Sequence, residues 1–184
     1  MTDRVRELNK TNINSEIEKF ISEIKDISLP SDSKGIDLLL KLKRNKIGSP
    51  SYYKDVSYFE GANRIMTDLI ILYGVRWLLE RSNFEFEEYV VEFGNENKRD
   101  HDVMSMNSSG STLTGEAFNV AESFFQGKKS KMLSKLRDNK NSNYKLILVN
   151  EDAVKDTYTP KLKSNEYLLF VDIFGEKTKM HQAM

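Results

Sequence analysis

The hydrophobic positions of the chain change from a helical to an alternating repeat near residue 84. Before that point, two segments repeat with the spacing of one helix face. The first, residues 15–27, opens at Ser15 with the Ser-x-x-Glu pattern of a capping box. The second, residues 59–82, has enough apolar positions to be buried on more than one side. The sequence therefore predicts two helices, and the polar residues 1–12 before them are expected to be frayed.

The alternating part predicts three strands that follow one another closely. Apolar and polar residues alternate over residues 84–93, with a slip that predicts a bulge, and again over residues 102–106 and 113–121. Turns that contain glycine and asparagine separate these segments. Because the connections are short, we expect the three strands to form an antiparallel meander.

A third helix and two further strands complete the predicted fold. The helix opens at Ser123, which Gln126 would help to cap. It separates the meander from the apolar run at residues 144–149, so this run can lie parallel to a neighbouring strand. Residues 167–174 predict the last strand, and the polar tail after them predicts no element. The pattern is typical of an α/β fold with a mixed central β-sheet flanked by helices.

Length and composition place the chain among soluble globular proteins. Its 184 residues, 39% of them hydrophobic and 30% charged, suit a single domain over residues 1–184, with an N-terminal helical part at residues 13–50. The lack of cysteine excludes disulfides, zinc–thiolate sites and thiol catalysis. The sequence has no signal-peptide core and no apolar run of membrane length, which predicts a cytoplasmic protein without membrane contact.

Positive charge is local, because 28 Lys and Arg residues balance 28 Asp and Glu residues. Two clusters of basic side chains stand out, with Lys43, Arg44 and Lys46 in the first and Lys128, Lys129 and Lys131 in the second. Such clusters can neutralise nucleic-acid phosphates, and Tyr52, Tyr53 and Tyr58 after the first cluster could stack on bases. The alternatives are solvated helix faces for the clusters and core packing for the tyrosines.

Two acids on neighbouring predicted strands form the sharpest candidate site. Asp102 opens the second strand of the meander and Glu116 lies inside the third. Pairing of these strands would bring both carboxylates to one end of the sheet, where a hard cation such as Mg²⁺ takes oxygen ligands. A metal held there would polarise a phosphoryl oxygen and lower the pKa of a bound water. The alternative is two solvated acids at strand ends.

Polar neighbours extend this candidate site. His101 could act as a general base or contact a substrate, and the alternative is a surface position, since adjacent residues of a strand face opposite sides. Asn119 and Gln126 could contact phosphate or base edges, or serve as loop and cap residues.

The order of elements around the two acids resembles the core of the PD-(D/E)XK, or restriction-endonuclease-like, nucleases. Over residues 59–149 a helix is followed by a strand, a strand that opens with Asp102, a strand that contains Glu116, a helix and a strand. The resemblance implies that Asp102 and Glu116 bind Mg²⁺ and that Glu60 is the supporting acid of the first helix. For Glu60, a favourable interaction with the helix dipole is the alternative.

The chain departs from the family pattern at one position. The lysine of the Glu-x-Lys motif is replaced by Phe118. Some family members take this positive charge from the following helix, where Lys129 lies in the middle of an apolar stripe. Lys129 could therefore orient or deprotonate the attacking water, or it could extend to solvent or form a structural ion pair.

Two functions remain open from the sequence. The resemblance implies a Mg²⁺-dependent DNA endonuclease, similar to a type II restriction endonuclease, that leaves a 5′-phosphate and a 3′-hydroxyl and cuts both strands as a homodimer. The alternative is an inactive protein of the same fold that binds DNA or a protein partner as a restriction or phage-defence accessory. Phe118 in place of the motif lysine is the reason to keep the alternative.

Overall fold

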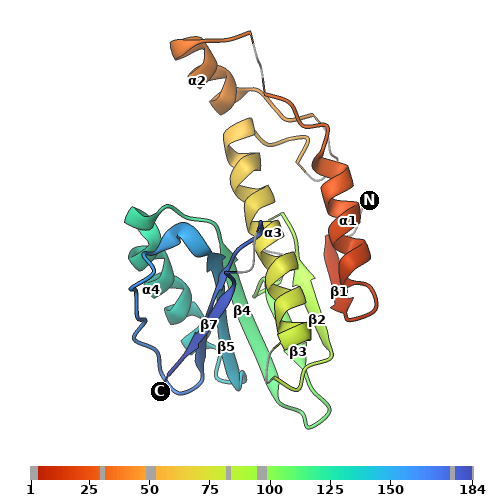
Figure 1. Cartoon of the computed structure of the whole chain (residues 1–184), viewed down its shortest axis with the longest axis vertical. Coiled ribbons are helices and arrows are strands. Elements are labelled where there is room, and N and C mark those ends of the chain that lie inside the picture. Colours follow the sequence, from red (N-terminus) through yellow and green to blue (C-terminus); the bar gives the residue numbers. More distant parts are fainter. Residues whose placement is uncertain are drawn as a thin grey trace.

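The computed structural model of the chain describes residues 4–29, 32–48, 53–81, 84–94, 99–174 and 177–183 (Figure 1). The helices in these ranges are α1 (Ile13–Ile24), α2 (Gly35–Arg44), α3 (Tyr58–Arg81), α4 (Glu122–Asp138) and the short 3-10 helix η1 (Glu151–Ala153). The strands are β1 (Val5–Asn9), β2 (Glu88–Glu92), β3 (Val103–Met106), β4 (Thr112–Phe118), β5 (Tyr144–Asn150), β6 (Glu166–Val171) and β7 (Lys179–Gln182).

All described strands belong to one mixed sheet in which the order in space follows the order in the chain. Strands β1 to β4 are antiparallel, β4, β5 and β6 are parallel, and β7 returns antiparallel to β6. The predicted meander, which corresponds to β2, β3 and β4, is confirmed. The parallel crossover through α4 to β5 is confirmed as well, and so is the α/β class with a mixed sheet.

Helices α3 and α4 cover opposite faces of the sheet. Successive residues of a strand point to opposite faces. In β5, Leu146 and Leu148 belong to the hydrophobic core on the α3 side, and Ile147 and Val149 belong to the core on the α4 side. Coverage of both faces explains why β5 is almost continuously apolar.

Helix α3 runs from the sheet out beyond it, and its burial changes along its length. The first turns are largely exposed, whereas residues 69–72 are all buried, as expected for a helix enclosed on more than one side. Gly74 lets the buried half approach the sheet closely, because a Cβ atom there would lie 2.3 Å from Leu148 Cδ2. The projecting half is therefore free to form one wall of a cleft.

The N-terminal segment contains a strand that the sequence did not predict. Residues 1–12 were expected to be frayed, but β1 pairs with β2 from Val5↔Glu92 to Asn9↔Glu88. Its single buried side chain, Leu8, gives too little alternation to be recognised locally. Helix α1 then begins at Ile13, so the predicted cap is wrong: Ser15 lies inside the helix.

The structure also differs from the prediction at the start of β2, at the start of α4 and in the C-terminal tail. Residues 84–87 precede β2 without joining it, because Phe84 packs on Tyr144 and Tyr167, with ring centroids 5.2 and 4.6 Å apart. At α4 the helix starts at Glu122, and no side chain caps it, so Ser123 and Gln126 have no capping role. The polar tail contains β7, which depends on hydrogen bonds from β6.

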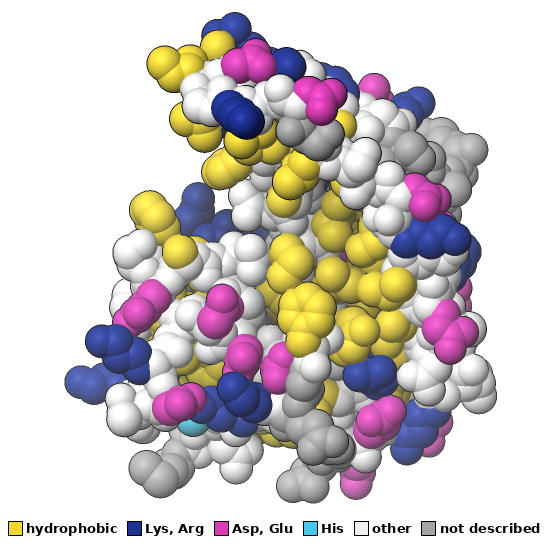
Figure 2. Space-filling view, turned by 45° about the horizontal axis from the view of Figure 1, so that its top comes forward, with side chains coloured by type: hydrophobic (Ala, Val, Ile, Leu, Met, Phe, Trp, Pro, Cys, Tyr) yellow, Lys and Arg dark blue, Asp and Glu magenta, His cyan; other side chains and the backbone are white. Residues whose placement is uncertain are grey.

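Hydrophobic side chains remain exposed on one face of the molecule, surrounded by charged ones (Figure 2). Helix α2 buries none of its side chains. Between the end of α1, the segment before α3 and α3 itself lies an apolar hollow of about 270 Å³, to which Ile24, Ile47 and Ile65 contribute. Within the described ranges, no helix combines the length and apolar character needed to cross a lipid bilayer.

Candidate active site

The register of the meander brings the two predicted acids together. Val103 pairs with Gly115, so the next residues outward along the two antiparallel strands are Asp102 and Glu116. The carbonyl oxygen of Asp102 accepts a 2.9 Å hydrogen bond from the Glu92 amide, and Asp102 Oδ2 accepts one of 2.8 Å from the Ala117 amide. The first contact therefore fixes the backbone of Asp102, and the second fixes its carboxylate.

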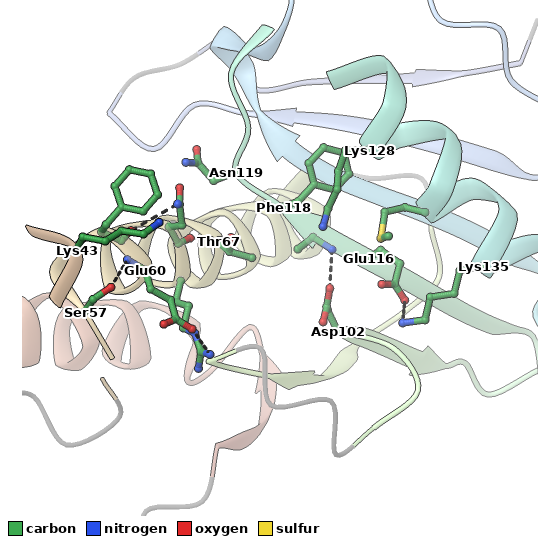
Figure 3. A pocket seen from close by; sticks show the side chains of 15 residues that line it. Lys43, Ser57, Glu60, Thr67, Asp102, Glu116, Phe118, Asn119, Lys128 and Lys135 are labelled. Atoms are coloured by element: carbon green, nitrogen blue, oxygen red, sulfur yellow. Dashed lines mark hydrogen bonds and ion pairs between the residues drawn. The ribbon is translucent and has the colours of Figure 1, made fainter. Parts of the chain in front are cut away.

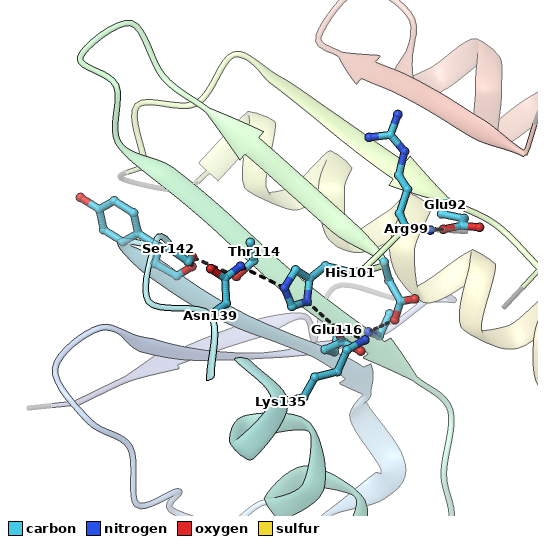
Figure 4. Close-up of polar contacts among 11 residues, drawn as sticks. Glu92, Arg99, His101, Thr114, Glu116, Lys135, Asn139 and Ser142 are labelled. Atoms are coloured by element: carbon cyan, nitrogen blue, oxygen red, sulfur yellow. Dashed lines mark hydrogen bonds and ion pairs between the residues drawn. The ribbon is translucent and has the colours of Figure 1, made fainter. Parts of the chain in front are cut away.

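Glu116 is buried, and one of its oxygens has two partners (Figure 4). His101 Nδ1 lies 2.7 Å and Lys135 Nζ lies 2.8 Å from Glu116 Oε1. The side-chain amide of Asn139 lies 3.1 Å from His101 Nε2. A neutral imidazole that donates from Nδ1 and accepts at Nε2 satisfies both contacts. His101 is itself buried, so the alternative of a surface position is wrong.

One oxygen of each carboxylate remains available. Among the described residues, neither Asp102 Oδ1 nor Glu116 Oε2 has a hydrogen-bond or ion-pair partner. Burial raises the pKa of Asp102 to about 6, and the negative charges of Glu116 and Glu92 act in the same direction. The Ala117 amide and the Lys135 ammonium lower it again. A bound cation would stabilise the ionised form of this buried carboxyl.

Both acids line a cleft of about 730 Å³ between the projecting half of α3, the α4 helix and the end of β4 (Figure 3). Its cationic side chains are Lys43, Arg64, Lys128 and Lys135. Its neutral polar side chains are Ser57, Asn63, Thr67 and Asn119, and its aromatic side chains are Phe59 and Phe118. The cleft therefore joins two carboxylates to a surface suited to an anionic ligand.

The lysines of α4 that reach the cleft are not the one that the sequence predicts. Lys128, Met132 and Lys135 lie at i, i+4 and i+7 and form the stripe that faces the cleft. Lys129 is one position away, buried on the sheet side, where its Nζ donates a 2.6 Å hydrogen bond to the Tyr158 hydroxyl. The expectation that Lys129 approaches the acids is wrong, and its partner is a neutral hydroxyl, so it neither extends to solvent nor forms an ion pair with a described residue.

Phe118 lies on the same face of β4 as Glu116, two residues away. Its ring is buried in the core under α4 and forms part of the cleft wall, with Lys128 Nζ 5.9 Å from the ring centroid. The position of the family lysine is thus filled by an apolar ring, and cations reach the acids from the helix above it.

Glu60 lies at the other end of the cleft from the acid pair (Figure 3). Its carboxylate forms a 2.6 Å ion pair with Arg64, and half of its side chain is exposed. Its amide donates a 3.2 Å hydrogen bond to Ser57 Oγ, which places Glu60 in the first turn of α3. The helix-dipole alternative therefore accounts for Glu60 without a role at the acid pair.

Some of the remaining predicted nucleic-acid contacts line the cleft, and others lie outside it. Lys43 and Asn119 line the cleft, whereas the other predicted nucleic-acid contacts, Arg44, Lys46 and Lys131, are exposed outside it. Gln126 is also exposed outside the cleft. Tyr52 lies outside the described residues. Tyr58 lines the apolar hollow instead of the cleft, and Tyr53 is fully buried, so stacking of Tyr53 on bases is wrong.

A further buried acid, Asp68, lies near the acid pair and was not predicted from the sequence pattern. Asp68 of α3 accepts hydrogen bonds from the Tyr53 hydroxyl and from the Gly94 amide, the latter at 3.0 and 3.1 Å. Burial raises its pKa to about 7, and the charge of Asp102 contributes. Arg64 donates to the Gly94 carbonyl at 2.8 Å, so α3 holds both sides of this residue. The sequence feature that could have revealed Asp68 is that it is a single acid within the apolar run of α3.

The donor set fits a hard divalent cation that keeps most of its water. No group of three or more His, Cys, Asp or Glu side chains in the described ranges is arranged to hold a metal. The free oxygens of Asp102 and Glu116 could supply two carboxylate ligands. Mg²⁺ is typically held by one or two carboxylates together with water and substrate phosphate.

Comparison with protein-family models, with curated proteins and with solved structures gave no match to this chain. Function must therefore be inferred from the residues of the cleft.

Proposed function

We propose that the protein is a Mg²⁺-dependent DNA endonuclease built on a restriction-endonuclease-like core. The observation that carries the proposal is the pair Asp102 and Glu116, each with a free oxygen, in a cleft lined by four cationic side chains. The succession of α3, β2, β3, β4, α4 and β5, with Asp102 directly before β3 and Glu116 in β4, supports the core assignment. An anionic substrate beside paired carboxylates requires a cation between them, because like charges repel.

Each residue of the site has a role that follows from its contacts. Asp102 Oδ1 and Glu116 Oε2 would hold the metal, and His101 would orient Glu116 through the opposite oxygen. Mg²⁺ bound there would supply a polarised phosphoryl oxygen and a water of lowered pKa. Lys135, the nearest cation, would stabilise the charge that develops on the phosphate, in place of the motif lysine.

The proposal includes how the enzyme would act on a duplex. A small nuclease with one site per chain cuts both strands most simply as a two-fold symmetric homodimer, because a two-fold protein matches a two-fold DNA site. We also propose a cytoplasmic location, since the chain has no cysteine for oxidative crosslinks.

A plasmid-cleavage assay with and without Mg²⁺ tests the proposal. The variant Glu116→Gln keeps the volume of the side chain and removes its charge, so we expect cleavage to fall by at least about a hundred-fold. Glu122→Gln is the matched control, because Glu122 is an exposed glutamate at the start of α4 with only a 4.0 Å contact to Lys155. Its activity should equal that of the wild type.

Two outcomes would contradict the nuclease proposal. Cleavage that continues in Glu116→Gln would mean that the acid pair is not the active site. No cleavage by folded wild-type protein that still binds DNA would favour the inactive binding protein, for which Phe118 in the lysine position would be the reason.

A further inference from the structure

The half of the cleft away from the acid pair contains an exposed aromatic ring. Phe59, Asn63 and Thr67 lie at i, i+4 and i+8 on α3 and line the cleft together. Phe59 is 58% exposed, whereas the other aromatic residue of the cleft, Phe118, is 3% exposed. Phe59 is next in sequence to Glu60, which lies at the other end of the cleft from the acid pair (Figure 3), so the ring is separate from the two acids.

This ring carries a cation beside it. Lys43 Nζ, from α2, lies over one face of the Phe59 ring, 5.1 Å from its centroid, so a stacked ligand would use the other face. The exposed part of the ring is apolar surface that a ligand bound in the cleft can cover. The side chains that line the cleft include four cations and three acids, so a ligand that combines a flat apolar surface with negative charge complements the part around Phe59 and Lys43.

Nucleic acid with an unpaired base has that combination. Aromatic side chains stack on bases of single strands, while neighbouring cations follow the phosphates. A base inside a duplex is already stacked between its neighbours, so it becomes available only in a single strand, at an overhang, or after rotation out of the helix. Asn63 and Asn119 supply amide groups in the same cleft that can pair with a base edge.

We propose that Phe59 is a stacking platform for an unpaired base of the nucleic acid bound in the cleft. The proposal deepens the nuclease function and rests on it for the identity of the cleft as a nucleic-acid site. It adds a substrate class: a strand that has at least one unstacked base a few nucleotides from the acid pair.

Binding measured without cleavage tests this site separately from the chemistry. Fluorescence anisotropy in EDTA would compare single-stranded DNA, single-stranded RNA and blunt duplex DNA with wild type, Phe59→Ala and Phe124→Ala. Phe124 is the matched control, because it is an exposed phenylalanine of α4 (69%) that lies outside the cleft. Circular dichroism and thermal melting would establish that each variant is folded.

We expect Phe59→Ala to weaken binding of single strands by about ten-fold, within the range for removal of one stacked base. Duplex affinity should change less than two-fold, and Phe124→Ala should match the wild type. Replacing one nucleotide of the single strand by an abasic one should weaken wild-type binding at one position and have no further effect in Phe59→Ala. Similar decreases for DNA and RNA would identify the base as the shared feature, and a decrease for one alone would identify the preferred strand.

Equal affinities of Phe59→Ala and Phe124→Ala for single strands would overturn the proposal, and so would an equal decrease for duplex and single strands. Stacking at Phe59 by a protein that cleaves nothing would leave this site in place and contradict only the nuclease function. Cleavage that requires Glu116, with no effect of Phe59 on binding, would do the reverse.

Discussion

The Lys135 ammonium, 2.8 Å from Glu116, is the cation nearest to the acid pair, while Lys129 is occupied by Tyr158. We therefore expect Lys135→Ala to lower the cleavage rate by about a hundred-fold, since one charge-stabilising group in a catalytic site has an effect of this size. Lys129→Met should keep cleavage within a few-fold, because it retains volume in the core under α4. Single-turnover rates on a plasmid would measure both variants, and the opposite ranking would restore Lys129 as the functional lysine.

The raised pKa of Asp102 makes stability depend on pH. Its carboxyl has a pKa of about 6 in the fold against an ordinary value of 3.8, so the folded protein binds the proton more tightly than the unfolded chain. The free energy of unfolding should therefore fall as pH rises from 3.8 to about 6. Asp68, with a pKa of about 7, acts in the same direction.

Asp102→Asn isolates the contribution of this residue. The variant should have a smaller fall in stability over that pH range and a higher free energy of unfolding at pH 7, because the charge that burial disfavours is gone. Urea unfolding at several pH values would measure it. A variant that is less stable than the wild type at pH 7 would show that the hydrogen bond from Ala117 outweighs the cost of burial.

Single residues were predictable where the rule that positions them is simple. Asp102 and Glu116 could be placed side by side because strand pairing and a period of two leave little freedom. The apolar stripe of α4 correctly placed Lys129 on the buried side of the helix. The cation that contacts Glu116 is Lys135, on the neighbouring stripe that faces the cleft, and the apolar pattern does not show which stripe reaches the acids. The contact between His101 and Glu116 needed the loop before β3, which has no periodic pattern.

Helix α4 carries two of the cleft lysines, and its last turn is fixed to β6 by an ion pair. Arg137 Nε and Nη2 donate to Glu166 at 2.6 and 2.9 Å, and Glu166 is fully buried. We expect Arg137→Ala to lower the free energy of unfolding by about 1–3 kcal/mol, between the values for exposed and buried pairs because Arg137 is partly exposed. Chemical denaturation would measure it, with Lys131→Ala, exposed on the same helix, as the control that should change little.

Long elements with a strong repeat were predicted, and short edge strands were not. Helix α3 and strand β5 have apolar patterns that match their burial directly. Strands β1 and β7 lie at the two edges of the sheet, and each is held by hydrogen bonds from one neighbour. The neighbour of β1 is about eighty residues away in the chain, so no local pattern reveals the pairing.

At the scale of the molecule, zero net charge hides an uneven distribution of cations. Lys43 and Lys128 line the cleft, whereas Lys131 is exposed outside it. Replacing Lys43 or Lys128 by Ser should lower the slope of log affinity against log salt by about 0.7–0.9 for each phosphate that the variant no longer neutralises. Lys131→Ser should leave the slope unchanged. Equal slopes in all three variants would show that nucleic acid does not follow the cleft.

The topology of the sheet could be predicted from the sequence, whereas the cleft could not. The alternation of helical and strand patterns was sufficient for a mixed sheet with a parallel crossover. The cleft was not predictable, because it depends on how far α3 extends beyond the sheet and on where α2 and α4 stand beside it. These are distances between elements, and periodicity within an element does not encode them.

Because Lys135 comes from α4, the ribosome synthesises the acid pair before the lysine that contacts it. Asp102, directly before β3, and Glu116, in β4, are both synthesised before α4, and α4 is anchored by Glu166 of a still later strand. An incomplete chain has the carboxylates without a fixed lysine beside them. If the protein cuts DNA, the activity would therefore reach its full rate only once synthesis has passed β6, and a prematurely terminated chain would cut the genome of the cell that makes it more slowly than the complete protein.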